Sequence, residues 1–306
     1  MKVCPAVRIS QAPPLWANLL RQRESWDAQE LMSGNEEFVE ANRRLWNEWA
    51  PIHAASAFYD VERFKEGGIR LRPYELEEVG EVAGKDLLHV QCHFGLDTLS
   101  WARLGATVTG ADFSQASIDL ATGLAEELGI PARFVCADLA GLPSVLPGDF
   151  DVVYASRGVL GWLPDLSVWA DVAAHFLRPG GFLYLTEAHP MLWVWDDDEG
   201  VTDLRLRYPY FSRPEPLAFP VRGSYADPDA EIREPVEYGW PHDLGSIVTA
   251  VARAGLRIEF LHEFPFSSWP APFLEPHDDR TWRLPSTVQG ELPLFFSLKA
   301  SKPSNV

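Results

Sequence analysis

Apolar residues in this chain gather into two kinds of segment, short apolar runs and longer amphipathic stretches. The short runs lie at 86–95, 106–113, 131–139, 150–156 and 182–188. The stretches between them have helical period and read LDTLSWARLGA, SQASIDLATGLAEELGI and PDLSVWADVAAHFLRPGG. Strands that are apolar on both faces and alternate with helices are typical of a parallel sheet covered by helices. The pattern therefore predicts a doubly wound α/β fold.

Capping residues bound the predicted helices. Ser114 and Asp165 stand where N-caps belong, and Gly129 stands at a helix end. Ahead of the first strand, residues 35–55 present one apolar helical face that we expect to end near Pro51.

The first 36 residues and one long internal segment depart from the regular alternation of strands and helices. We expect a mobile or loosely docked extension over 1–36 and one domain over 37–306. Residues 190–240 are rich in Trp, Tyr, Phe, Pro and Arg and have no sustained period, which predicts an aromatic cap inserted after the fifth strand. A helix and a strand follow over 242–264, and 291–300 reads as a final, seventh strand.

Charge and cysteine content exclude several classes of function. The chain has 26 Lys and Arg against 44 Asp and Glu, a net charge of −18, which disfavours nucleic acids and anionic membranes as partners. It has no apolar run of about 20 residues, and its beginning fails as a signal peptide, so we expect a cytoplasmic protein. Three cysteines without a CxxC pair support neither a metal site nor a disulfide framework. The oligomeric state is left open.

The predicted sheet implies a binding site at the carboxyl ends of its strands. Asp112 ends the second strand, where a carboxylate accepts hydrogen bonds from the two hydroxyls of a ribose, and Phe113 beside it can cover an adenine face. Asp138 in the CADL segment, which also holds Leu139, ends the third strand and can accept from an adenine amine. Together these residues predict a nucleoside pocket.

The loop after the first strand distinguishes between nucleoside cofactors. A dinucleotide needs glycines that let the backbone approach its pyrophosphate, whereas this loop has only Gly95, with Gln91, His93 and Phe94 around it. A cofactor with adenosine and no phosphate, such as S-adenosylmethionine, makes fewer demands on this loop. A nicotinamide-dependent oxidoreductase on the same α/β frame is the alternative.

With these motifs, the chain resembles a class I S-adenosylmethionine-dependent methyltransferase of small-molecule type, in an actinobacterial-looking subgroup. The resemblance covers about residues 40–303 and is carried by LHVQCHFGLDTLSWARLGA, GADFSQASIDLA, CADL, FDVVYASRGVLGWLPD and FLRPGGFLYLTEAHP. Family members read like VLDLGCGTG in the first loop, so His89 takes the acidic position, and Gln91 and His93 replace glycines. The resemblance also implies an antiparallel last strand that enters between strands five and six.

The resemblance implies further cofactor contacts. Ala155 and Ser156, after the fourth strand, would face the methionine amino group, and Arg72 in RLRPYE is a candidate for the methionine carboxylate, with an ordinary surface ion pair as its alternative. Gln91, His93 and Gly95 belong to the loop that, in the family, hydrogen-bonds the methionine part of the cofactor.

Methyl transfer from a sulfonium is an in-line displacement, and a general base is needed only where the acceptor must lose a proton. Our candidates for proton removal or acceptor orientation are His189 and His53, although each could simply bond a turn or cap a helix. The predicted acceptor-binding residues are Tyr59, Arg157, Trp162, Trp193, Trp195 and His242.

The sequence therefore predicts an S-adenosylmethionine-dependent enzyme that methylates a small molecule, with oxygen slightly preferred and a role in secondary metabolism. A methyltransferase-like binding protein without turnover is a second alternative, because the first loop departs from the family pattern.

Overall fold

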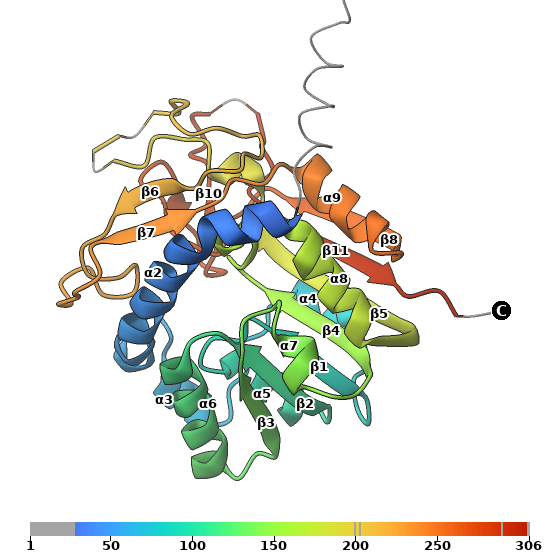
Figure 1. The fold of residues 1–306 in the computed structure, drawn as a ribbon. Helices are drawn as coiled ribbons and strands as arrows, with labels where there is room; N and C mark the ends of the chain where they lie inside the picture. Colours follow the sequence, from blue (N-terminus) through green and yellow to red (C-terminus); the bar gives the residue numbers. More distant parts are fainter. Residues whose placement is uncertain (1–27, 199, 202, 289, 305–306) are drawn as a thin grey trace, which may run out of the picture.

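Seven strands form the central sheet of the computed structural model, which describes residues 28–198, 200–201, 203–288 and 290–304. The strand order is β3-β2-β1-β4-β5-β11-β8 (Figure 1). The strands are β1 (Asp86–Val90), β2 (Thr107–Asp112), β3 (Ala132–Cys136), β4 (Phe150–Ser156), β5 (Leu177–Ala188), β8 (Arg257–Phe264) and β11 (Phe295–Ser301). β1 to β5 pair in parallel, while β11 runs antiparallel to both β5 and β8. The predicted fold and the predicted place of the last strand are confirmed.

Helices cover both faces of this sheet. One face packs against α7 (Leu142–Val145), α8 (Leu166–Phe176) and α9 (Leu244–Arg253). The other packs against α3 (Val61–Lys65), α4 (Pro73–Val79), α5 (Leu96–Arg103) and α6 (Gln115–Leu128). The predicted caps are confirmed, since Ser114 Oγ accepts from Ser117 N, Asp165 accepts from Ser167 N, and Gly129 is left-handed with φ 62°.

Helix α2 (Ala28–Ala55) is longer than the sequence pattern indicates. It begins inside the predicted extension, whose residues 1–27 lie outside the described part of the chain, and it continues past Pro51. Proline removes one helical hydrogen bond, at about 3 kcal/mol or more, but the buried face of Leu45, Trp49 and His53 runs across it. Burial of that face favours continued helix.

Helix α2 also joins the sheet layer to the cap. Asn47 Oδ1 accepts from Ser114 Oγ at 2.9 Å, at the start of α6. One and a half turns earlier, Asn42 Nδ2 donates to the Tyr238 carbonyl at 2.7 Å, and its Oδ1 accepts from Tyr238 N at 2.9 Å. One rigid element therefore contacts both the cofactor-side helices and the inserted segment.

Two excursions from the sheet form the cap. The first, after β5, contains the 3-10 helix η2 (Pro190–Leu192) and the hairpin of β6 (Leu217–Pro220) and β7 (Val236–Gly239). The second lies between β8 and β11 and contains β9 (Glu275–Pro276) and β10 (Trp282–Arg283). β6, β7 and β10 lie on the same side of the sheet in Figure 1. The sequence pattern indicated the first excursion but not the second.

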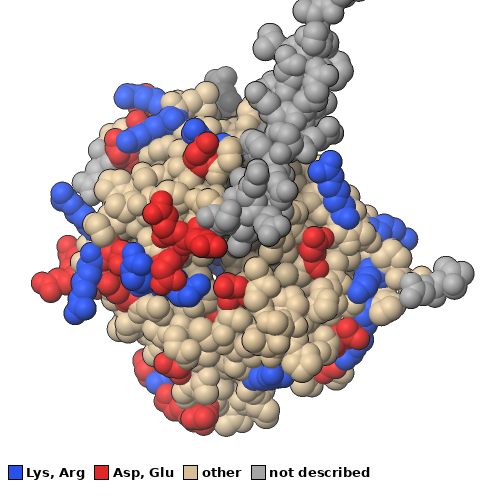
Figure 2. Space-filling model, in the orientation of Figure 1, with Lys and Arg blue, Asp and Glu red and all other residues tan. Residues whose placement is uncertain are grey.

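Surface charge is mixed in sign. Figure 2 shows Lys and Arg side chains scattered among acidic ones on this face of the molecule. Among the helices that the structure describes, none has the length and apolar character that a bilayer span requires.

Candidate functional site

A cavity of about 640 Å³ lies at the carboxyl ends of β1 to β4. Its walls are the residues that follow those four strands, together with side chains of α2 and of both cap excursions. This volume falls within the roughly 300–1,000 Å³ typical of small-molecule sites. The site therefore lies where a parallel α/β sheet normally binds its ligand.

The predicted nucleoside residues meet at one end of the cavity. Asp112 is only 8% exposed, and its two carboxylate oxygens accept from His93 N at 2.8 Å and from Ser114 N at 2.9 Å. Burial raises the pKa of Asp112 to about 6. Asp138, whose Oδ1 accepts from Gly141 N at 2.7 Å, lines the same end. Phe113 and Leu139 also line the cavity, and we call this part the nucleoside end.

The loop after β1 keeps a left-handed backbone at the two positions where the resemblance implies glycines. Gln91 and His93 have φ of 56° and 52°, and Gly95 has φ 83°. Each non-glycine residue in this region costs about 1–2 kcal/mol, so the surrounding structure imposes the conformation. Gln91 is held by its Nε2, which donates to the Val159 carbonyl at 2.9 Å.

His89, in the acidic position of the family pattern, links three elements beneath the loop. Its Nδ1 lies 2.8 Å from Thr98 Oγ1 on α5, and its Nε2 lies 3.2 Å from Ser156 Oγ at the end of β4. Burial lowers the pKa of His89 to about 4, so the ring is neutral at pH 7. Where the family pattern has a carboxylate, this chain thus has a neutral ring whose two nitrogens contact the hydroxyls of Thr98 and Ser156.

Charged groups cluster beside this connection. The Arg157 guanidinium lies 2.6 Å from Asp97 and 3.7 Å from Glu75. Burial alone would raise the pKa of Asp97, but Arg157 outweighs burial and holds that pKa below its usual range. Glu75 is fully buried and also accepts from the Tyr154 hydroxyl, and burial raises its pKa. Arg157 is therefore fixed in the cavity wall by two carboxylates.

Aromatic side chains and two histidines form the wall between α2, the first loop and the cap. His93 lines the cavity, and its Nε2 lies 3.2 Å from Nδ1 of His53, which is fully buried behind it. Burial lowers the pKa of His53 to about 3. The Tyr59 ring stacks on His53 with centroids 5.2 Å apart, and its hydroxyl meets that of Tyr225 from the cap. His53 thus contacts the site only through its neighbours.

Most predicted site residues line the cavity, and six do not. The lining set is Tyr59, Arg72, Gln91, His93, Gly95, Asp112, Phe113, Asp138, Leu139, Ser156, Arg157 and Trp162. The predicted residues outside it are His53, Ala155, His189, Trp193, Trp195 and His242.

Local contacts explain the placement of the five besides His53. His189 is the N-cap of η2, where its Nδ1 accepts from Met191 N and its Nε2 lies 3.0 Å from Glu263. Nε2 of His242 lies 2.8 Å from the Leu163 carbonyl. Trp193 is 54% exposed, Trp195 packs with the cap cluster, and Ala155 is fully buried in the sheet.

Several cavity residues had not been predicted from the sequence. These are Arg70, Glu75 and Asp97 near Arg157, Tyr225 in the first excursion and Trp269 in the second, of which all but Glu75 line the cavity. A signal existed for three of them. Arg70 and Glu75 belong to the same RLRPYE run as Arg72, and Trp269 lies in FPFSSWPAPF, which resembles the first excursion in composition.

The sheet order, the antiparallel β11 and the carboxylates at or just after the ends of β2 and β3 match the fold of class I S-adenosylmethionine-dependent methyltransferases. Residues 87–181 match the family model described as a methyltransferase domain, which runs from β1 into β5. The chain therefore contains a methyltransferase domain of this class, and the predicted class and cofactor, S-adenosylmethionine, are confirmed. The actinobacterial subgroup stays a prediction.

Curated relatives are methyltransferases, and a solved structure shares the fold. The chain is 29% identical over 145 residues to the ubiquinone biosynthesis O-methyltransferase of Photorhabdus laumondii, covering 46% of this chain and 60% of the relative. It is 32% identical over 135 residues to that of Xanthomonas euvesicatoria, covering 43% and 56%. The fold matches an S-adenosylmethionine-dependent methyltransferase from Mesorhizobium loti with TM-score 0.53 and 20% identity, covering 75% and 96%. The chain thus spans less than two thirds of the curated relatives.

The residues present fit S-adenosylmethionine. Each carboxylate oxygen of Asp112 accepts one backbone N–H, which leaves lone pairs for the two ribose hydroxyls. Among the described residues, Oε1 of Gln91 in the cavity wall is buried without a hydrogen-bond partner. Buried polar atoms usually have a partner, so an unpaired oxygen in a ligand pocket is consistent with a ligand donor.

Proposed function

We propose that this chain transfers a methyl group from S-adenosylmethionine to a small molecule, with oxygen preferred over nitrogen or carbon as the acceptor atom. The observation that carries the proposal is the shared cavity of Asp112 and Asp138, at the ends of neighbouring strands, with an aromatic wall beyond them. The relatives' O-methyltransferase names support oxygen. A role in secondary metabolism stays a prediction.

Each cofactor contact follows from the chemistry of the residue. Asp112 would accept from the ribose hydroxyls, and Asp138 from the adenine amine, while Phe113 covers the adenine face. Arg72 is assigned to the methionine carboxylate, and the Ser156 region to the methionine amino group. These assignments use the residues that line the cavity, so Ala155 is left out.

The chain's own contribution to catalysis is alignment and exclusion of water. S-adenosylmethionine supplies an electrophilic methyl group on a sulfonium, which a nucleophile displaces in line. Trp46, Tyr59, Trp162, Tyr225 and Trp269 form a largely apolar wall that would hold a flat acceptor and keep water away.

An acceptor that must lose a proton would find His93 in the cavity wall. Its Nδ1 makes no hydrogen bond with the described residues, while its Nε2 is held by His53. Burial lowers the pKa of both rings, so both are neutral at pH 7. His93 can take a proton at Nδ1 in the tautomer in which its Nε2–H donates to His53 Nδ1. His53, predicted as catalytic, is therefore assigned as the residue that positions His93.

Calorimetric titration with S-adenosylhomocysteine tests the proposal. We expect saturable binding at a single site in folded protein, and no binding up to millimolar ligand would refute the cofactor assignment. Titration with a nicotinamide dinucleotide under the same conditions tests the oxidoreductase alternative. A second assay follows S-adenosylhomocysteine release with a panel of phenols, alcohols and amines, and binding without release by any of them would favour the alternative of a binding protein.

A further inference from the structure

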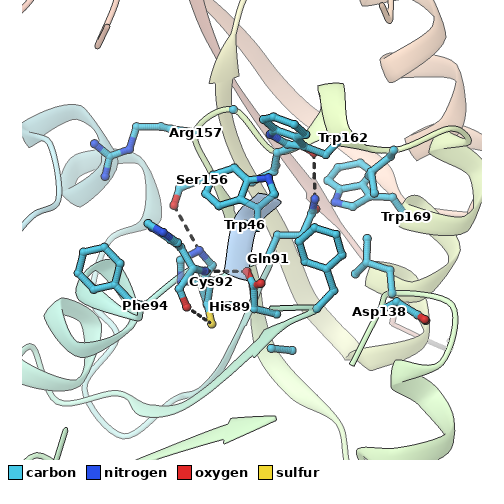
Figure 3. Close-up of a pocket in the computed structure, with 18 of the residues that line it drawn as sticks. Trp46, His89, Gln91, Cys92, Phe94, Asp138, Ser156, Arg157, Trp162 and Trp169 are labelled. Carbon is cyan, nitrogen blue, oxygen red and sulfur yellow. Dashed lines mark hydrogen bonds between the residues drawn. The ribbon is translucent and has the colours of Figure 1, made fainter. Parts of the chain in front are cut away.

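The cavity extends well past the nucleoside end. In Figure 3, Asp138 and Trp169 lie on one side of the cavity, and Arg157 and Phe94 lie on the other, with Gln91 and Trp162 between them. Arg70 also lies on the Arg157 side of the cavity. Nη2 of Arg157 donates to the Arg70 carbonyl at 3.4 Å. We call this side the acceptor end.

Three guanidinium groups line the acceptor end, and only one of them is paired. Arg157 lies within ion-pair distance of Asp97 and Glu75, and the charge of Asp97 also acts on Arg70 from beyond that distance. Arg70 and Arg72 form no ion pair with the carboxylates of the described residues. Their guanidinium groups each donate to one backbone carbonyl, Arg70 to Phe58 at 3.4 Å and Arg72 to Arg280 at 3.3 Å. Both are long bonds that leave most N–H groups free.

Unpaired positive charge in this place needs an explanation. Arg70 and Arg72 are half-buried, and burial lowers the pKa of each. Holding charges away from water is costly unless counter-charges or hydrogen bonds compensate. The chain as a whole carries a net charge of −18, so two half-buried cations without a carboxylate partner run against its general composition. The methionine carboxylate of the cofactor would pair with Arg72, which leaves Arg70 without an assigned anionic partner.

Three aromatic rings line the same cavity as Arg70. The carbonyl that it contacts belongs to Phe58, whose ring lies 5.6 Å from the Tyr225 ring. The ring of Trp269 packs on Gly158, which follows Arg157 in the chain, so closely that a Cβ there would stand 3.2 Å from it. All three rings line the cavity. An acceptor here meets aromatic faces together with one free guanidinium.

We propose that the methyl acceptor is a planar aromatic carboxylate whose carboxylate group pairs with Arg70. This inference rests on the proposed function, because it places the acceptor beside the S-adenosylmethionine site. A guanidinium presents its N–H groups in a planar fork that matches a carboxylate, and ring faces stack on Phe58, Tyr225 and Trp269. The overall negative charge of the protein disfavours anions, so the local pairing with Arg70 provides the selection.

The test compares matched ligands on protein saturated with S-adenosylhomocysteine. The pairs are 4-hydroxybenzoate with 4-hydroxybenzamide and 4-hydroxycinnamate with its amide, and binding is followed by calorimetry and by quenching of tryptophan fluorescence. We expect each carboxylate to bind at least about tenfold more tightly than its amide, as a charge-assisted pair provides. Arg70→Gln should abolish this preference and leave S-adenosylhomocysteine affinity unchanged. Arg253→Gln, an exposed arginine on α9, is the matched control and should change neither.

Each outcome decides between the two proposals. Equal affinity for acid and amide, including no detectable binding of either, would overturn the carboxylate assignment while S-adenosylhomocysteine binding still supports the proposed function. Loss of S-adenosylhomocysteine binding in Arg70→Gln, with normal binding in Arg72→Gln, would show that Arg70 serves the cofactor instead. Failure of the unaltered protein to bind S-adenosylhomocysteine would refute the proposed function itself.

Discussion

The buried carboxylate of Asp112 predicts that cofactor binding depends on pH. Burial raises its pKa to about 6, and only the ionised form accepts from both ribose hydroxyls while it keeps its bonds to His93 N and Ser114 N. At pH 5 about a tenth of the carboxylates would be ionised, since each pH unit below a pKa reduces the ionised fraction about tenfold. S-adenosylhomocysteine should therefore bind roughly tenfold more weakly at pH 5 than at pH 7.

Burial shifts the groups beside Asp112 away from its own range: it raises the pKa of the Cys92 thiol well above and lowers that of the His93 ring well below their usual values. Burial also raises the pKa of Glu237 on β7 to about 7, so the Asp112→Asn variant is needed to assign the transition. Titration calorimetry at constant ionic strength measures the affinity across this range. Asp112→Asn keeps one acceptor oxygen but removes the charge, so it should weaken binding at pH 7 at least about tenfold and remove the pH dependence.

Two results would refute this reasoning. One is an affinity that stays constant from pH 5 to 7 in the unaltered protein, and the other is a pH dependence that persists in Asp112→Asn. Without ligand the effect on stability has the opposite sign. The folded pKa of about 6 lies above the unfolded value of about 3.9, so the contribution of Asp112 to stability rises as the pH falls from about 6 to 4.

Three further substitutions test the site. Asp97→Asn leaves the buried Arg157 with a weaker counter-charge. It should lower the free energy of unfolding, measured by denaturant titration, by about 3 kcal/mol. Adding Arg157→Gln removes the uncompensated charge and should recover part of this loss. Gly95→Ala should destabilise more than Gly129→Ala, because both residues have positive φ but only at Gly95 would the new methyl stand 2.9 Å from a phenylalanine ring. Asp138→Asn should reduce the preference for S-adenosylhomocysteine over its inosine analogue, measured by competition, whereas equal preference would remove Asp138 from adenine recognition.

Local sequence signals predicted the parts of the fold that depend on local physics. Strands β1 to β5 were visible as apolar runs, and the caps at Ser114 and Asp165 were visible as residue types. Asp112 and Asp138 were found because a parallel sheet places its strand ends at one edge, a rule that needs no knowledge of packing.

The remaining features depended on contacts between distant segments. His189 follows a strand end as Asp112 does, but its side chain caps η2 and lies 3.0 Å from Glu263 on β8, a contact that the local pattern does not indicate. Arg157 and Glu75 are far apart in the sequence, so the local pattern around either residue does not predict that they form an ion pair. Trp269 reaches the cavity from an excursion that has no helical or strand period to reveal it.

The contacts of helix α2 bear on the rates at which the two products leave the cavity. Its side chains, Trp46 among them, form part of the cavity wall, while Asn47 holds the start of α6 and Asn42 holds the cap hairpin. Because α2 is hydrogen-bonded at both points, we expect it to move as one body when the cavity opens. Opening at the nucleoside end and at the acceptor end would then have the same activation barrier. We expect the nucleoside product and the methylated product to leave at linked rates. Loosening Asn42 should then speed the release of a nucleoside that this side chain does not touch.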